Sequence, residues 1–164
     1  MSPRWWTPWA PTTYAYTGGG QLWTEDCPFS NDTVTNSYTS RLRTGLAFQQ
    51  PAGLWANGFW YDHAKRLTNV TSPAGTCSYT LVGQASRLSK LTLPNTSYIT
   101  NHYNNVARLL FTKLNNSSHS TLNSHQYTYN SGNQRTKHTR PDNSHLTFSY
   151  DNLGQLTIVR ATNS

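Results

Sequence analysis

The sequence predicts an all-β protein, built as an array of antiparallel β-hairpins, and three observations carry that prediction. A seven-residue phrase recurs along the 164 residues at a spacing near 22. Short turns containing Pro or Gly divide the segments between the phrases into paired β-type runs. The chain is dense in Thr, Asn, Gly and Pro, which disfavour helix, while aromatic residues make up 13%.

The recurring phrase reads Tyr, then Asp or a small polar residue, two free positions, Gly or Ala, Gln or Arg, and Leu. Clear copies begin at Tyr61 and Tyr150, close copies at Tyr16 and Tyr103, and weaker copies at Tyr38 and Tyr129. Successive starts are 22, 23, 42, 26 and 21 residues apart, and the 42 splits at Tyr79, which opens a degenerate unit. The signature residues are Tyr16, Gly20, Leu22, Tyr38, Leu42, Tyr61, Asp62, Arg66, Leu67, Tyr79, Tyr103, Arg108, Leu109, Tyr129, Tyr150, Asp151, Gly154 and Leu156.

Between the phrases, each segment is expected to form one hairpin. The turns are expected at residues 50–53, 72–75, 94–97 and 141–144. Proline presets φ in these turns and Gly accepts a positive φ. The flanking strands are expected at 46–49 and 54–60, 67–71 and 76–81, 88–93 and 98–103, and 136–140 and 145–150. Alternation such as Leu146, Phe148 and Tyr150 predicts one aromatic and one polar face.

The phrase itself is interpreted as the connection between successive hairpins. Its Tyr ends a strand on the packed face, and its Asp, Asn or Thr bonds nearby backbone. Its Gly or Ala relieves crowding at the turn, and its Leu returns to the packed face. The array is expected over residues 14–160, in six to seven units, after an irregular segment rich in Trp and Pro (1–13) and before a tail (161–164).

These phrases resemble the YD repeats of the rearrangement-hotspot (Rhs) proteins of bacteria, in particular residues 61–70 and 150–159. The resemblance covers residues 14–160 and implies a hairpin array wound into a curved, twisted sheet. In full-length members such a sheet is part of a shell around a C-terminal toxic or effector segment. The conserved core that follows the repeats, with its DPxG-type motif, is not found here. The resemblance is therefore to a fragment of the repeat region without the C-terminal core.

Charge and cysteine usage are less informative than the repeats. Lys and Arg number 13 against six acidic residues, giving a formal charge of +7. The basic residues fall in different repeats, so dispersed surface charge is expected and a nucleic-acid partner is not. Cys27 and Cys77 are more than two repeat units apart, which separates them by roughly 19 Å at about 4.8 Å per strand. That is beyond the reach of a disulfide, about 7 Å between Cα atoms, so both are expected to be free thiols.

No catalytic, metal or cofactor motif accompanies the repeats. None of the six histidines belongs to an HxH, HExxH or HxxxH pair with acidic support. Asp62 and Asp151 share a place in the phrase and are explained as turn residues. Glu25, Asp26 and Asp32 lack the spacing of a calcium loop. The expectation is therefore no catalytic residue, no metal, no cofactor and no enzymatic activity.

The function expected is a structural repeat segment of an Rhs protein, contributing to a β-shell or surface scaffold that encloses or presents an effector. Aromatic faces would share a continuous core, and partners would be neighbouring repeats or an enclosed effector. Self-association through exposed sheet edges is expected as well. The rival interpretation is a carbohydrate-binding module that uses the aromatic face. No signal peptide or membrane span is seen, and the family resemblance suggests a secreted or cell-surface protein.

Overall fold

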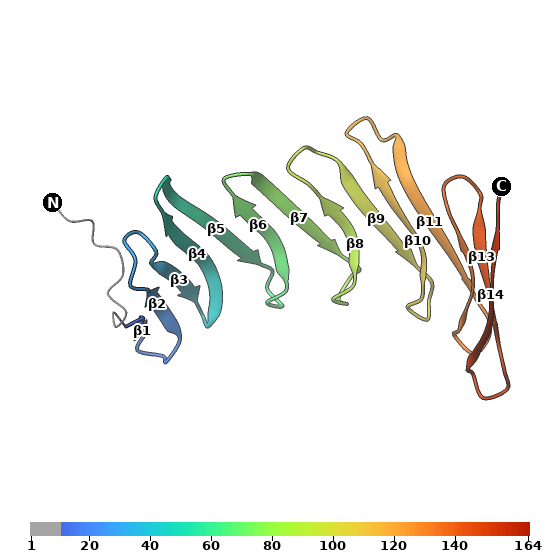
Figure 1. Cartoon of the computed structure of the whole chain (residues 1–164), viewed down its shortest axis with the longest axis horizontal. Coiled ribbons are helices and arrows are strands. Elements are labelled where there is room, and N and C mark those ends of the chain that lie inside the picture. Colours follow the sequence, from blue (N-terminus) through green and yellow to red (C-terminus); the bar gives the residue numbers. More distant parts are fainter. Residues whose placement is uncertain (1–10) are drawn as a thin grey trace. The chain divides into compact units, whose positions relative to one another are not determined.

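The computed structural model describes residues 11–164, and every regular element in that range is a β-strand (Figure 1). The prediction of an all-β array of antiparallel hairpins is confirmed. No helix in the described range is long and apolar enough to cross a membrane. The expected irregular segment, with Trp5, Trp6 and Trp9, lies almost wholly outside the described residues.

The chain divides into two compact units, Met1–Cys77 and Ser78–Ser164. In the first unit, six strands follow chain order and each pairs antiparallel with the next. They are β1 (Thr13–Tyr16), β2 (Leu22–Asp26), β3 (Val34–Thr39), β4 (Leu42–Gln50), β5 (Gly53–Tyr61) and β6 (Leu67–Ser72). Strand β7 (Gly75–Leu81) begins in this unit and ends in the second.

In the second unit, the end of β7 pairs with β8, and the remaining strands again follow chain order in antiparallel pairs. They are β8 (Leu88–Thr92), β9 (Tyr98–Tyr103), β10 (Leu109–Asn115), β11 (Thr121–Tyr129), β12 (Arg135–Thr139), β13 (His145–Tyr150) and β14 (Leu156–Thr162). Each unit is thus an antiparallel meander.

The expected Pro and Gly turns are present. Gly53 and Gly75 open β5 and β7 with φ of 125° and 116°, a region that residues with a Cβ rarely adopt. Turns 94–97 and 141–144 place Thr96 and Asn143 at φ 65°, with local side-chain hydrogen bonds around each turn. These turns alternate with the phrase turns at the other ends of the strands.

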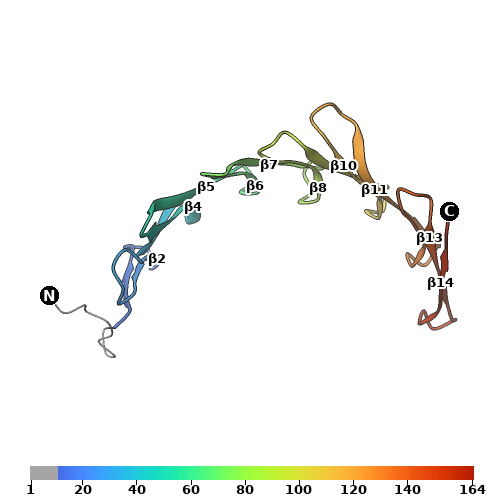
Figure 2. The same ribbon diagram turned by 45° about the horizontal axis from the view of Figure 1, so that its top comes forward.

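The expectation of a continuous aromatic core is wrong. Within the part of the chain that the structure describes, each unit is a single layer of strands with no second layer packed on it (Figure 2). Among residues 11–164 no hydrophobic side chain is buried; the buried residues are Asn36, Asn115 and Ser144. A single layer leaves both faces accessible, so its apolar side chains gain only partial burial against neighbours on the same face.

The second unit still segregates its side chains between two faces. Directly paired residues of antiparallel strands project on the same face. Tyr79 pairs with Leu91, Leu91 with Ile99 and Ile99 with Leu114, which makes a cross-strand apolar row. We call the side carrying this row the apolar face. The expectation of one aromatic and one polar face is met only in part, because Tyr98 and Phe111 project on the opposite side from this row.

Candidate functional site: the phrase turns

The phrases form one recurrent backbone turn. In the copy that begins at Tyr61, the Asp62 N–H donates to the Arg66 carbonyl and the Lys65 N–H donates to the Asp62 carbonyl, both at 2.9 Å. The same two bonds, from the second residue to the sixth and from the fifth to the second, recur in the copies that begin at Tyr16, Tyr103, Tyr129 and Tyr150. Five copies with different side chains therefore share one backbone geometry.

The second residue of the phrase holds the turn with its side chain. Asp151 Oδ1 accepts from the Leu153 and Gln155 amides at 2.9 and 2.8 Å. Asn104 Oδ1 accepts from the Val106 and Arg108 amides at 3.1 and 3.0 Å. These bonds satisfy turn amides that have no strand partner, which explains the preference for Asp, Asn or Thr at this position.

At Asp62 the carboxylate also receives the Arg66 side chain. Asp62 Oδ1 accepts from the Arg66 amide at 3.0 Å, and Oδ2 accepts from Arg66 Nε at 2.7 Å. An ion pair joins Oδ2 to the guanidinium at 2.7 Å. The backbone hydrogen bond from Arg66, followed by its side-chain bond and charge, lowers the pKa of Asp62 below its ordinary value.

In the five copies that share this turn, the fifth residue of the phrase has a left-handed backbone. Its φ is 76° at Gly20, 62° at Lys65, 69° at Ala107, 64° at Asn133 and 83° at Gly154. The expected crowding differs between copies: a Cβ at Gly20 would meet nothing within 4 Å, whereas a Cβ at Gly154 would stand 3.0 Å from Gln134 Nε2. What the position requires is a positive φ, which costs residues with a Cβ roughly 1–2 kcal/mol.

Gly20→Ala is therefore expected to lower the free energy of unfolding by about 1 kcal/mol through backbone strain. Gly18→Ala is the matched control, since a Cβ there also meets nothing within 4 Å and its φ lies outside the positive range. Urea denaturation followed by tryptophan fluorescence measures both. Equal effects at the two positions would contradict the assignment of strain to φ.

The phrase tyrosine reaches back to the preceding repeat. In five copies its hydroxyl donates to one backbone carbonyl 15 to 20 residues earlier. The bonds are Tyr38 to Leu22 (2.9 Å), Tyr61 to Arg43 (2.9 Å), Tyr103 to Leu88 (3.1 Å), Tyr129 to Leu109 (2.8 Å) and Tyr150 to Arg135 (2.8 Å). Each acceptor pairs with a residue at or next to the end of the strand before the preceding turn, which is a phrase tyrosine in four cases and Leu81 in the unit that contains Tyr79. We call this bond the backward link.

The sixth residue of the phrase reaches forward to the next turn. Gln21 Nε2 donates to the Arg41 carbonyl at 3.2 Å, and Gln134 Nε2 donates to the Gly154 carbonyl at 3.1 Å. Arg108 donates to the Asn130 carbonyl at 3.1 Å, and its guanidinium lies 5.4 Å from the Tyr129 ring centroid. In these three copies the Gln or Arg of the phrase therefore supplies a forward link, a role that the sequence did not suggest.

The Tyr of five phrases ends a strand and the Leu of five phrases begins one, while the Gly, Asp and Arg signature residues lie in the turns between. Tyr79 lies inside β7 instead, and Leu81 takes the first position of that turn by pairing with Leu88. The turn that follows Leu81 is one residue longer than the turns of the other phrases. The Val82 amide donates to the Arg87 carbonyl at 2.9 Å across it.

The copy at Tyr38 has a shorter turn. Tyr38 pairs with Arg43 and Thr39 with Leu42, leaving the two central residues Ser40 and Arg41 at φ 49° and 68°. Two successive positive φ values are the conformation of a type I′ hairpin turn.

Two histidines that are distant in the sequence meet in the second unit. His125 Nδ1 and His138 Nε2 are 2.9 Å apart, and the Tyr127 ring stacks on His138 with centroids 5.0 Å apart. Burial lowers the pKa of His138, and the charges of His125, Arg135 and Arg140 lower it further. The pairing depends on strand register, so no local histidine motif could reveal it.

His138 is expected to make the second unit less stable in mild acid. Its folded pKa lies below the ordinary value near 6.5, so the unfolded chain takes up the proton first as the pH falls. Stability should be independent of this group above about pH 6.5 and decline as the pH drops towards the folded pKa. His138→Gln should flatten that decline in urea titrations at several pH values, and His63→Gln, in an exposed turn, should leave it in place.

The acidic residues near the start of the array do not converge. Glu25 and Asp26 are neighbours in β2 and so project on opposite faces, and Asp32 Oδ2 accepts from the Phe29 amide at 2.8 Å. No group of three or more His, Cys, Asp or Glu side chains within the described range is placed to hold a metal. Cys27 and Cys77 are both free and half-buried.

No protein-family model and no curated protein matches this sequence. Solved structures do match. A crystal structure of TcdB2-TccC3-Cdc42 superposes with a TM-score of 0.75 at 16% identity, covering 93% of this chain and 9% of that chain. A crystal structure of TcdB2-TccC3 without its hypervariable C-terminal region gives a TM-score of 0.73 at 16% identity, with the same coverages.

A third crystal structure, of TcdB2-TccC3-TEV, gives a TM-score of 0.51 at 12% identity over 88% of this chain. This chain therefore spans about a tenth of the length of the chains it matches, 9% in each of the three. At such low identity the likeness shows the fold. That fold is the Rhs-like one implied by the phrases.

Proposed function

We propose that this chain is a non-enzymatic repeat segment of an Rhs-type, YD-repeat protein. It contributes to a β-shell or surface scaffold that encloses or presents a toxin or effector. The backward link is the observation that carries the proposal, because it uses the tyrosine that opens every clear phrase. Its acceptor is a backbone carbonyl, so the link tolerates sequence change around it. Such links suit a polypeptide that holds its shape by repetition.

The partner that fits the last strand best is another repeat. Leu156 pairs with Tyr150 as Leu109 pairs with Tyr103, and the Leu109 carbonyl receives the Tyr129 hydroxyl. All seven residues of β14 are exposed, which leaves its outer edge open among the described residues. The same open edge leads us to propose self-association of the isolated chain.

Adding one repeat is expected to stabilise the second unit. In the test protein, residues 161–164 are removed and a second copy of residues 140–164 is joined directly after Arg160. In one-dimensional arrays, an added unit contributes its own stability plus an interface term. We expect a higher urea midpoint and a larger denaturant slope, since more surface is buried. Replacing the copied Tyr150 by Phe should cancel about 1 kcal/mol of the gain. An unchanged slope would show that the added segment does not dock.

The reading frames that flank the gene test the larger proposal. We expect further Tyr-Asp phrases at the spacing of about 22 residues on one or both sides, and a core with a variable segment downstream. Stop codons on both sides, with no phrase between, would contradict a role in a shell.

A glycan array distinguishes the scaffold function from the carbohydrate-binding alternative. Trp55 and Trp60 are five residues apart in β5 with no register shift between them, so they project on opposite faces. A single platform that includes both is therefore not formed. A scaffold should show no saturable glycan binding, and Trp-to-Ala changes should alter stability only; saturable binding would favour the alternative.

A further inference from the structure

Four basic residues of the second unit recur with the period of the repeat. They are Lys90, Lys113, Lys137 and Arg160, at intervals of 23, 24 and 23 residues. They lie in β8, β10, β12 and β14, one in every second strand. No Asp or Glu occurs in strands β7 to β14, so no carboxylate interrupts them.

Strand register brings the four onto one face. Lys90 and Lys113 both pair with Thr100, so Thr100 separates them in one row. Lys137 and Arg160 both pair with Thr147 in a second row. Because paired residues share a face, each row is one-sided.

The two rows lie on the same face of the unit. Phe111, two residues before Lys113, pairs with Gln126, and Gln126 pairs with Thr139, two residues after Lys137. Residues two apart in a strand share a face. We call this side the basic face; it is opposite the apolar face, because Leu91 neighbours Lys90 in β8.

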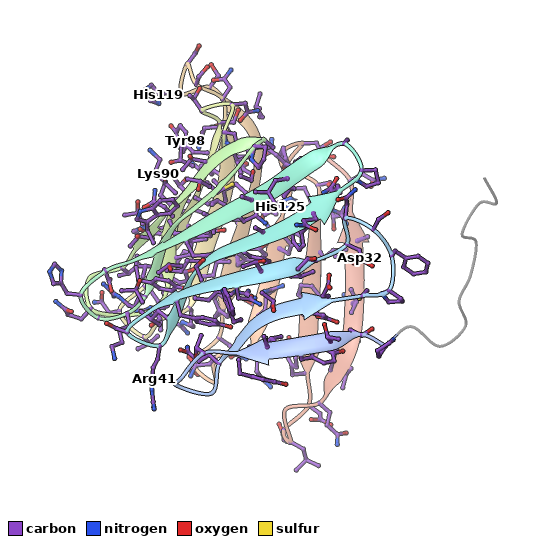
Figure 3. All side chains as sticks on the ribbon, turned by 90° about the vertical axis from the view of Figure 1, so that its left-hand side faces the viewer. Asp32, Arg41, Lys90, Tyr98, His119 and His125 are labelled. Atoms are coloured by element: carbon purple, nitrogen blue, oxygen red, sulfur yellow. The ribbon has the colours of Figure 1, made fainter. Side chains whose placement is uncertain are left out.

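Aromatic rings lie beside two of these cations, Lys90 and Lys113. Lys90 Nζ lies 4.2 Å from the Tyr98 ring centroid, and Lys113 Nζ lies 4.9 Å from the Phe111 centroid. The His102 ring stacks on Phe111 at 5.1 Å and 13°. Figure 3 shows Lys90 and Tyr98 projecting together on one side of the strands. The ion pair formed among the described residues, Asp62 with Arg66, involves none of the four cations.

We propose that the basic face binds single-stranded nucleic acid. Cations within a row stand two strands apart, about 9.6 Å, and offer successive contacts to a phosphate backbone. The rings beside Lys90 and Lys113 offer π-faces on which unpaired bases stack. An acidic polypeptide would use the charges and leave the rings without a role. This activity is separate from the scaffold function proposed above, and either can fail alone.

The first experiment measures binding of a fluorescein-labelled 20-nucleotide oligothymidylate by anisotropy at several salt concentrations. The variant Lys137→Gln/Arg160→Gln is compared with Arg41→Gln/Lys65→Gln, which removes two charges from exposed turns of the first unit. We expect the first variant to bind on the order of tenfold more weakly, and its log–log salt slope to shrink by about 1.4. The second variant should keep the parent slope. Equal losses in both variants would overturn the proposal, since binding would then follow net charge.

The second experiment tests the rings. Phe111→Leu on the basic face should weaken binding about tenfold, and Phe148→Leu in β13 should leave binding unchanged. Phe148 neighbours Thr147 and so projects on the apolar face, and circular dichroism checks that both variants are folded. Unchanged affinity in a folded Phe111→Leu variant would overturn the proposal. So would equally tight binding of a 20-residue polyglutamate, because that would make the face a general polyanion surface.

Discussion

Replacing Tyr103, Tyr129 and Tyr150 together by phenylalanine is expected to lower the free energy of unfolding of the second unit by about 3 kcal/mol. Each change removes one hydroxyl that donates to a backbone carbonyl of the preceding repeat, at 3.1, 2.8 and 2.8 Å. A net hydrogen bond contributes roughly 1 kcal/mol, and the three links lie far enough apart to add. Urea denaturation followed by fluorescence and circular dichroism gives the value.

The matched control is the variant Tyr79→Phe/Tyr127→Phe. Both tyrosines lie inside strands, and within the described range neither hydroxyl makes a backward link. Phenylalanine keeps the stacking of Tyr127 on His138. The control should change stability by a few tenths of a kcal/mol per site. If the control variant lost as much free energy of unfolding per site as the triple variant, the result would contradict a special role of the phrase tyrosine.

Gly58→Ala in β5 is expected to destabilise the first unit by about 1–3 kcal/mol. The Trp60 ring lies against Gly58, and a Cβ there would stand 2.6 Å from Trp60 Cη2 and 2.8 Å from Thr71 Oγ1. Trp60 is 51% exposed, so its ring can swing into solvent, at the cost of its packing on the strand. Guanidinium titrations of the wild type and the variant measure the difference.

A double-mutant cycle identifies the cause. If the clash with Trp60 dominates, Gly58→Ala should cost much less in a Trp60→Ala background, because the space is then free. A cost that is equal in both backgrounds would place the effect in the backbone of β5 or at Thr71 instead. This cycle also tests whether an aromatic ring covers a strand glycine in a sheet that has no core.

Much of the fold followed from local sequence signals. The Tyr-to-Leu phrases and the Pro and Gly turns each depend on a few adjacent residues, and these predicted hairpins in chain order. The absence of a core did not follow, because alternation within a strand indicates a preferred face and not what covers it. Tyr79 was predicted to open a phrase because it is aromatic, but the turn begins after Leu81, which pairs with Leu88. Arg87-Leu88 carried the correct signal.

The sequence predicted only part of the candidate site. Asp62 and Asp151 were identified as turn residues, which agrees with their hydrogen bonds. The backward link joins residues 15 to 20 positions apart through strand register, and adjacent residues carry no sign of it. The basic face could have been found. The intervals of 23, 24 and 23 between its cations repeat the phrase period, whereas a search for adjacent charges overlooks them.

The central claim is that neighbouring strands pair in the register that aligns successive phrases, and cysteine trapping tests it most directly. In a Cys27→Ser/Cys77→Ser background, Ile99→Cys/Leu114→Cys joins directly paired residues. Their Cα atoms should be about 4.5–5.5 Å apart, within disulfide range. Ile99→Cys/Lys113→Cys shifts one thiol to the opposite face. We predict rapid oxidation of the first pair and none of the second, measured by mass spectrometry. Oxidation of the second pair alone would contradict the register and the links built on it.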